Sequence, residues 1–290
     1  MSLRKLPEIR ADARLHAAQF DVRPDALEKW QPEIRAAETG DASISILESI
    51  GEGWDGAGVT AKRIGAALRA IGNRDVRVDI NSPGGDFFEG VAIYNQLRAH
   101  PAKVTVNVMG LAASAASVIA MAGDEINMGD GAFLMIHNAW AFAIGNRHDL
   151  ADAATLLEPF DAAMAQVYAT RAGITAEAAA ALMDAETWMG AQQAVDAGFA
   201  DGLLAAGAVA QASAAASDGQ RAKAMIDTAL AKAGYGRAQR REAFAHLFAD
   251  KPSAAGTPGM PGAASNTAMP GAGDTDAAAT LQSLIAGLSG

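Results

Sequence analysis

The stretch Gly110–Asp124, which reads GLAASAASVIAMAGD, decides how the rest of the chain is interpreted. A mostly β-branched run, Val104–Val108, precedes it, and small residues surround Ser114. The residues after Ser114 are mainly Ala, Val, Ile and Met, and this segment ends at Gly123. The pattern predicts a strand, a tight turn and a buried helix, with the Ser114 hydroxyl where the helix begins.

A hydroxyl at the start of a helix suits catalysis as well as capping. The first N–H groups of a helix have no intrahelical partners, and the helix dipole is positive there. Such a position can stabilise an oxyanion or an alkoxide-like nucleophile. A serine is a weak nucleophile until a base removes its proton, and a third group holds that base in place. A catalytic Ser114 therefore requires a base and an acid elsewhere in the chain.

Composition excludes several classes of function. The 290 residues include no cysteine, which rules out disulfides, zinc–cysteine sites and a thiol nucleophile. We expect no membrane span, because no apolar run reaches about 18 residues. The N-terminal MSLRKLPEIRADAR lacks the apolar core of a signal peptide, so we expect a cytoplasmic protein. The net charge of -10 argues against a nucleic acid partner.

Strand and helix patterns alternate through the centre of the chain. The expected strands are Ser43–Leu47, Val76–Ile80, Lys103–Val108, Glu125–Met128, Phe133–Ile136 and Thr187–Met189. The expected helices are Ala61–Ile71, Phe87–Leu97, Arg147 to about Arg171, Ala176–Met183 and Ala191–Ala197. This alternation predicts an α/β domain over residues 41–204 with right-handed crossovers. Pro159 predicts a kink or break near Glu158 in the longest helix.

The two ends of the chain differ from this centre. Residues 1–40 form an N-terminal segment with no clear pattern, and residues 205–250 predict a helical extension. Within that extension, Arg237, Arg240 and Arg241 fit a solvated helix face. Residues 251–290 are rich in Pro, Gly and Ala, which predicts a disordered tail.

The sequence offers a candidate oxyanion-binding site and a candidate general base. The pair Gly84–Gly85 lies between a strand and a helix, where glycine lets backbone N–H groups approach a ligand, although an ordinary turn has the same pattern. Of the five histidines, only His137 ends an apolar strand, and a structural histidine fits that position equally well. Asp124, Asp149 and Asp184 are candidate carboxylates, and spacing alone does not choose among them.

Residues 76–204 resemble the ClpP family of serine peptidases, the caseinolytic proteases. Four motifs carry the resemblance, in this order: INSPGGDFFEGVAIYNQL at Ile80–Leu97, GLAASAAS at Gly110–Ser117, FLMIHNAW at Phe133–Trp140 and WMGAQQAVDAGFAD at Trp188–Asp201. The resemblance implies a ClpP/crotonase-like α/β fold of repeated ββα units, followed here by the largely disordered C-terminal extension. It also implies protein or peptide substrates and a homo-oligomeric ring joined through the helix at Arg147–Arg171, with no cofactor or metal.

The resemblance assigns roles to particular residues. The family's nucleophile falls on Ser114 and its general base on His137. Its oxyanion hole falls on the backbone N–H groups of Gly84 or Gly85 and of Ala115.

The acid of the family's catalytic triad lies just before the motif that begins at Trp188. Asp184 is the nearest match, across a gap of about two residues, and Glu186 is the competitor. The triad that the resemblance implies is therefore completed by Asp184, and this assignment is weaker than those of the serine and the histidine.

This sequence differs from the cellular members of the ClpP family at several positions, and these differences make the expected function more specific. Asn138–Ala139 replaces a motif with proline two residues after the histidine, and Ala115 replaces the usual Met or Gly after the nucleophile. The N-terminal region does not resemble the loops that engage ATPase partners. These features resemble the ClpP-like proteases of phages and prophages, which mature the head. We therefore expect an ATP-independent serine endopeptidase that cleaves capsid or scaffold proteins; the sequence leaves a separate ATPase partner open.

Three alternatives remain. Crotonase-type acyl-CoA enzymes stabilise an enolate in a similar backbone oxyanion hole, but they need neither Ser114 nor His137. A peptidase with a lysine base is disfavoured, because Lys62 and Lys103 are the only lysines between residues 30 and 204. The third alternative is a catalytically inactive capsid scaffold with the same fold.

Overall fold

The computed structural model describes residues 21–32, 34–36, 42–53, 58–141, 143–205, 207–211 and 214–248. The chain divides into two units, Met1–Ala249 and Asp250–Gly290, and every described residue belongs to the first. The tail expected to be disordered, residues 251–290, therefore lies outside the described residues.

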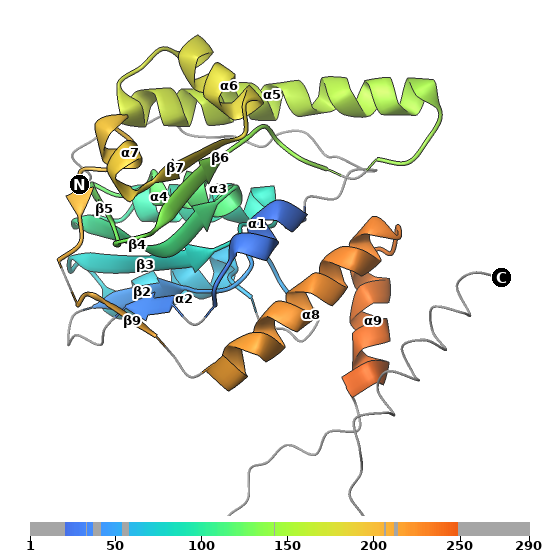
Figure 1. Cartoon of the computed structure of the whole chain (residues 1–290), viewed down its shortest axis with the longest axis horizontal. Helices are drawn as coiled ribbons and strands as arrows, with labels where there is room; N and C mark the ends of the chain where they lie inside the picture. The colour runs from blue at the N-terminus through green and yellow to red at the C-terminus, as the bar shows by residue number, and fades with distance from the viewer. Residues whose placement is uncertain are drawn as a thin grey trace, which may run out of the picture. The chain divides into compact units, whose positions relative to one another are not determined.

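Strands and helices alternate along the described chain as the sequence predicts (Figure 1). The strands are β1 (Ile34–Ala36), β2 (Ser43–Ile46), β3 (Val76–Ser82), β4 (Val104–Ala113), β5 (Glu125–Met128), β6 (Phe133–Ile136), β7 (Thr187–Gly190), β8 (Gly202–Leu203) and β9 (Val209–Gln211). The helices are α1 (Pro24–Lys29), α2 (Ala61–Ile71), α3 (Phe87–Arg98), α4 (Ala115–Ala120), α5 (Arg147–Ala172), α6 (Ala176–Asp184), α7 (Ala191–Asp196), α8 (Ala214–Lys232) and α9 (Arg237–Phe248).

A parallel sheet in the order β2–β3–β4–β5–β8 forms the centre of the fold. Strand β4 has two sets of neighbours: Thr105–Val108 pair with β5, and Leu111–Ala113 pair with β6. Strand β6 in turn pairs antiparallel with β7. The central strands are buried on both faces, which explains why β3 and β4 are so rich in apolar residues. The predicted α/β class is confirmed.

The tight turn predicted between the strand and the helix is confined to Ser114, and the strand before it is longer than the sequence pattern indicated. Strand β4 continues through Gly110 to Ala113, because its last residues pair with β6. Ser114 follows the strand directly with φ 56° and ψ −126°, and α4 begins at the next residue. All six residues of α4 are buried.

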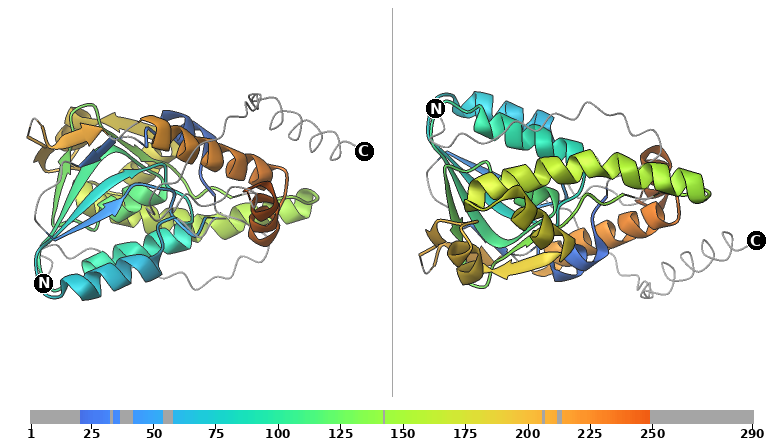
Figure 2. Two further views of the ribbon diagram at one scale, coloured as in Figure 1. Left: turned by 90° about the horizontal axis from the view of Figure 1, so that it is seen from below. Right: turned by 90° about the horizontal axis from the view of Figure 1, so that it is seen from above.

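Helices α2 and α3 lie side by side (Figure 2), and α3 also packs against α4. Their starts follow the capping rules, since Thr60 accepts a hydrogen bond from the backbone N–H of Arg63 and Asp86 accepts one from that of Glu89. The cap on α3 comes directly after Gly85, so it fixes where the glycine pair ends and the helix begins.

Helix α5 runs for 26 residues without the break expected near Glu158. It begins with a capping box between Asn146 and Asp149, and its second half is anchored by buried apolar side chains such as Phe160 and Met164. Pro159 lies on the exposed side, where water can satisfy the carbonyl group that proline leaves unpaired. The first half of the helix projects beyond the sheet (Figures 1 and 2).

The two ends of the described chain meet each other. Val22, Ala26, Leu27 and Trp30 pack with Leu111, Ala113 and Met135 in a second apolar cluster. Helix α1 packs against α8, and β1 pairs with β9. Arg240 is almost completely buried and forms ion pairs with Asp21 and Asp227, so the solvated helix face expected for it is wrong, whereas Arg241 is exposed.

A buried cation joins α5 to the ends of the sheet. The Arg171 side chain has no exposed surface; it donates hydrogen bonds to the carbonyl groups of Gly123 and Phe199 and pairs with Asp201. Substituting Arg171→Met leaves these acceptors without their donor and should lower the free energy of unfolding by roughly 3 kcal/mol.

Denaturant titration measures this loss. Arg147→Met, at the exposed start of the same helix, is the control and should change stability by no more than about 0.5 kcal/mol. Equal stability of the Arg171→Met and Arg147→Met proteins would contradict a structural role for the buried guanidinium.

Candidate active site

Parallel pairing of β4 and β6 brings a serine and a histidine together. Ala113 pairs with Met135, and the backbone N–H of Ser114 donates to the carbonyl of Met135 at 3.1 Å. One residue beyond the last strand residue on each side, the chain carries Ser114 and His137. Their side chains form a hydrogen bond of 2.8 Å between Ser114 Oγ and His137 Nε2.

Ser114 occupies a backbone conformation that non-glycine residues rarely adopt. Its φ of 56° is one of two positive values among the described non-glycine residues. Strain of this kind costs on the order of 1–3 kcal/mol and is commonly found at functional sites. Gly84 packs directly beneath it: a Cβ atom added to Gly84 would lie 2.7 Å from the Cβ of Ser114. The glycine is therefore required for the serine to sit where it does.

The glycine pair and Ala115 supply N–H groups next to Ser114. The N–H of Gly84 donates to Ser82 Oγ at 3.2 Å and is thereby occupied. Gly85 has φ 147°, and a Cβ there would lie 2.2 Å from the carbonyl oxygen of Ile50. Among the described residues, no hydrogen bond is made by the N–H groups of Gly85 and Ala115. These two donors remain for an oxyanion.

A small pocket of about 20 Å³, open to solvent, contains this arrangement. Ser114, His137, Ala115 and Gly85 all line it. The remaining wall is largely apolar and includes Phe87, Ala139, Trp140 and Met164, with Asp21 at the edge. The candidate nucleophile therefore faces a small apolar recess.

His137 is a neutral imidazole at neutral pH. Burial above all, together with the positive charge of Arg23, lowers the pKa of His137 from 6.5 to about 4. Glu186, Asp25 and a backbone hydrogen bond with Asn138 act in the opposite direction. A neutral imidazole can accept the proton of a serine, as a general base must.

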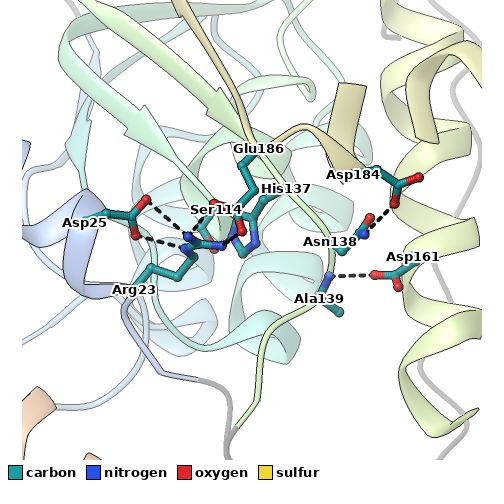
Figure 3. Close-up of polar contacts among 9 residues, drawn as sticks. All are labelled: Arg23, Asp25, Ser114, His137, Asn138, Ala139, Asp161, Asp184 and Glu186. Atoms are coloured by element: carbon teal, nitrogen blue, oxygen red, sulfur yellow. Dashed lines mark hydrogen bonds and ion pairs between the residues drawn. The ribbon is translucent and has the colours of Figure 1, made fainter. Parts of the chain in front are cut away.

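Neither of the two candidate acids, Asp184 and Glu186, forms a hydrogen bond with His137 among the described residues (Figure 3). Asp184 Oδ1 accepts a hydrogen bond from Asn138 Nδ2 at 2.7 Å. Among the described residues, the expected hydrogen bond between Asp184 and His137 is not found; the hydrogen bond of this carboxylate is with Asn138. The charge of Glu186, in contrast, acts on His137 directly.

Strand pairing brings the start of β7 next to the end of β6. Thr187 at the start of β7 lies opposite Ile136 at the end of β6 in an antiparallel pair. Glu186 comes directly before Thr187, in the turn after α6, with a positive φ of 49°. Asp184 is the last residue of α6 and lies before the turn.

Figure 3 also shows Arg23 and Asp25, which form a polar cluster with Glu186. The Arg23 guanidinium donates to both carboxylate oxygens of Glu186, at 2.5 and 2.7 Å, and to Asp25 at 2.9 Å. Hydrogen bonding to Arg23 lowers the pKa of Glu186, which keeps that carboxylate ionised. Sequence reasoning missed this pair, since nothing in residues 1–40 signals a contact 163 positions away.

The other candidate carboxylates have structural roles. Asp124 accepts from the backbone N–H of Val104 at 2.9 Å and lies 3.7 Å from the guanidinium of Arg98. Asp149 belongs to the cap of α5. Within the described ranges, no three His, Asp or Glu side chains are grouped as metal ligands, and no helix has the length and apolarity to span a membrane.

The cluster predicts how the histidine titrates. Replacing Arg23→Gln removes a positive charge that disfavours the imidazolium, so the pKa of His137 should rise from about 4 toward 6.5. An NMR titration of the imidazole protons measures the change directly. Lys29→Gln is the control from the same segment, because the Lys29 ammonium stacks on Trp188. An unchanged or lower His137 pKa in Arg23→Gln would contradict the described geometry.

Comparison with known proteins gives a consistent set of matches. The Clp protease family model matches residues 59–207. The ATP-dependent Clp protease proteolytic subunit of Ligilactobacillus salivarius is 35% identical over 133 residues, which are 45% of this chain and 68% of that protein. The ATP-dependent Clp protease proteolytic subunit 2 of Rhodococcus jostii is 33% identical over 140 residues, 48% of this chain and 72% of that protein. A solved ClpP1 mutant from Listeria monocytogenes is 20% identical with a TM-score of 0.47, covering 56% of this chain and 91% of that one.

Proposed function

The chain belongs to the Clp protease family, and we propose that it is a serine endopeptidase with Ser114 as nucleophile and His137 as general base. The 2.8 Å hydrogen bond between their side chains carries the proposal. His137 Nε2 takes the hydroxyl proton as Ser114 Oγ attacks a peptide carbonyl. The protonated histidine then gives its proton to the leaving amine, and water hydrolyses the acyl-enzyme.

We assign the oxyanion hole to the N–H groups of Gly85 and Ala115. Three donors follow from the family resemblance, and Gly84 is the one already bonded to Ser82. The two remaining N–H groups line the same pocket as the nucleophile. Preorganised backbone donors of this kind stabilise the charge that develops on the carbonyl oxygen in the transition state.

The serine–histidine pair favours a peptidase over a crotonase-type enzyme. Enolate stabilisation requires the backbone donors but neither a nucleophilic hydroxyl nor a base bonded to it. Here the hydroxyl of Ser114 lies within hydrogen-bond reach of a histidine that is neutral at pH 7. The apolar recess formed by Phe87, Trp140 and Met164 suits an apolar side chain of a peptide substrate.

We propose Glu186 as the acid that orients His137, with Asp184 as the alternative. The β6–β7 register and the charge acting on the imidazole support Glu186. Its bond with Arg23 leaves lone pairs for a further donor, because a carboxylate has about four acceptor sites. Catalytic hydrogen bonds are often long without substrate and tighten in the complex.

The proposal also covers the oligomeric state and the natural substrate. Leu150 in the projecting half of α5 is 47% exposed, which supports a homo-oligomeric ring joined through this helix. The departures at Ala115 and Asn138–Ala139 and the atypical extensions support a phage or prophage protease that cleaves capsid or scaffold proteins without ATP.

The first test is hydrolysis of an unfolded protein in the absence of ATP. Ser114→Ala should lower the turnover by at least about 10³-fold, since loss of a catalytic serine removes the covalent route. Ser45→Ala, at an exposed position on β2, should retain full activity. Undiminished hydrolysis by Ser114→Ala would refute the assignment of the nucleophile.

The second test separates the two carboxylates. Glu186→Gln should reduce turnover by about 10³–10⁴-fold, as the loss of an orienting acid does in serine proteases. Asp184→Asn keeps an acceptor for Asn138 and should retain most activity. Measured turnover in the reverse order would restore Asp184 as the acid.

A further inference from the structure

The peptide group between Ser114 and Ala115 connects the nucleophile to the oxyanion hole. A peptide group is planar, and its C=O and N–H point in opposite directions. The carbonyl of Ser114 and the N–H of Ala115 belong to one such plane. Any contact that fixes the Ser114 carbonyl therefore also fixes the direction of the Ala115 N–H.

A buried hydroxyl holds that carbonyl. Ser117 Oγ donates a hydrogen bond to the carbonyl oxygen of Ser114 at 2.6 Å, the shortest of three. The other two come from the backbone N–H groups of Ser117 at 2.9 Å and Val118 at 3.3 Å. Ser117 has no exposed surface. Backbone donors therefore already satisfy the carbonyl oxygen, and the hydroxyl is an additional constraint on the peptide plane.

A second buried hydroxyl stands behind the first. The oxygen of Tyr168, on α5, lies 2.8 Å from Ser117 Oγ. Ser117 has one hydroxyl proton, and the carbonyl of Ser114 can only accept, so that proton points to the carbonyl. Tyr168 must then donate to Ser117. Burial raises the pKa of Tyr168, so it remains a donor throughout the neutral range.

The direction of this chain has an electrostatic consequence. Each hydrogen bond in a series polarises the next, by perhaps 10–30% per bond in condensed phases. Donation from Tyr168 through Ser117 draws electron density toward the Ser114 carbonyl oxygen. The same polarisation makes the Ala115 N–H a stronger donor at the other end of the peptide plane.

We propose that Ser117 and Tyr168 are positioning residues that aim and polarise the Ala115 N–H toward the oxyanion. The inference rests on the proposed function, since it assigns a role within the same site. It links the strained Ser114 backbone to α5, a helix that contributes Met164 to the pocket wall. Ser117 therefore does more than fill space in α4.

The test uses the full chain with Ser117→Ala, Tyr168→Phe and the double variant. Each single change removes a hydroxyl and preserves most of the packing shape. Tyr94→Phe is the matched control, because Tyr94 is also buried and its hydroxyl bonds Arg98. Thermal unfolding verifies that each variant is folded. The functional readouts are kcat and KM for a short peptide amide and the affinity for a peptide boronic acid, whose serine adduct places an oxygen in the oxyanion hole.

Removing an oxyanion-hole donor lowers kcat by about 10²–10³-fold. A donor that is present but poorly oriented should lower kcat by less, on the order of tenfold. We expect this loss of kcat in both single variants, a parallel loss of boronate affinity and a KM changed by no more than about twofold. The double variant should match Ser117→Ala, because Tyr168 acts through Ser117.

Unchanged kcat and boronate affinity in folded Ser117→Ala and Tyr168→Phe would overturn the inference. Losses that multiply in the double variant would overturn the relay from Tyr168 through Ser117. Neither result touches the proposed function, which fails only if the unsubstituted protein is inactive or Ser114→Ala is active.

Discussion

The parallel pairing of the second half of β4 with β6 is the constraint on which the site depends. Both strands end at the same edge of the sheet, so the residues that follow them, Ser114 and His137, meet at 2.8 Å. The antiparallel pairing of β7 with β6 sets Thr187, the residue after Glu186, opposite Ile136, the residue before His137. Backbone hydrogen bonds between strands thus bring together Ser114 and His137, which are 23 positions apart in the chain. The Glu186 carboxylate is held by two hydrogen bonds from the Arg23 side chain.

Neighbouring residues change the properties of both Ser114 and His137. Behind Ser114, the missing side chain of Gly84 admits the strained serine, and the hydroxyls of Ser117 and Tyr168 hold its carbonyl. In front, Arg23 binds Glu186 and lowers the pKa of His137. Arg23 lies outside the residues that the family model matches. It directly precedes α1, which packs against α8. The N-terminal segment therefore contributes a positive charge to a site whose other residues lie in the central domain.

Local patterns predicted most of the fold because the forces that form those elements are local. Alternating apolar residues in β2 and the caps at Thr60 and Asp86 need only their neighbours. The end of β4 was misjudged because pairing with β6, not local propensity, extends it past Gly110. For the site, the family resemblance, and not spacing alone, predicted Ser114 and His137, and it placed the acid on Asp184 across a gap, with Glu186 as the competitor. No sequence pattern indicated a role for Arg23, since its partner Glu186 is 163 positions away.

The central claim is that the fold turns Ser114 into an activated nucleophile. Labelling of the full chain with a fluorophosphonate probe, followed by mass-spectrometric mapping of the adduct, tests this most directly, because the probe reacts with serines that a base has activated. The account predicts one adduct, on Ser114, and its loss in His137→Ala. An adduct on another serine, or equal labelling of Ser114 without His137, would contradict it.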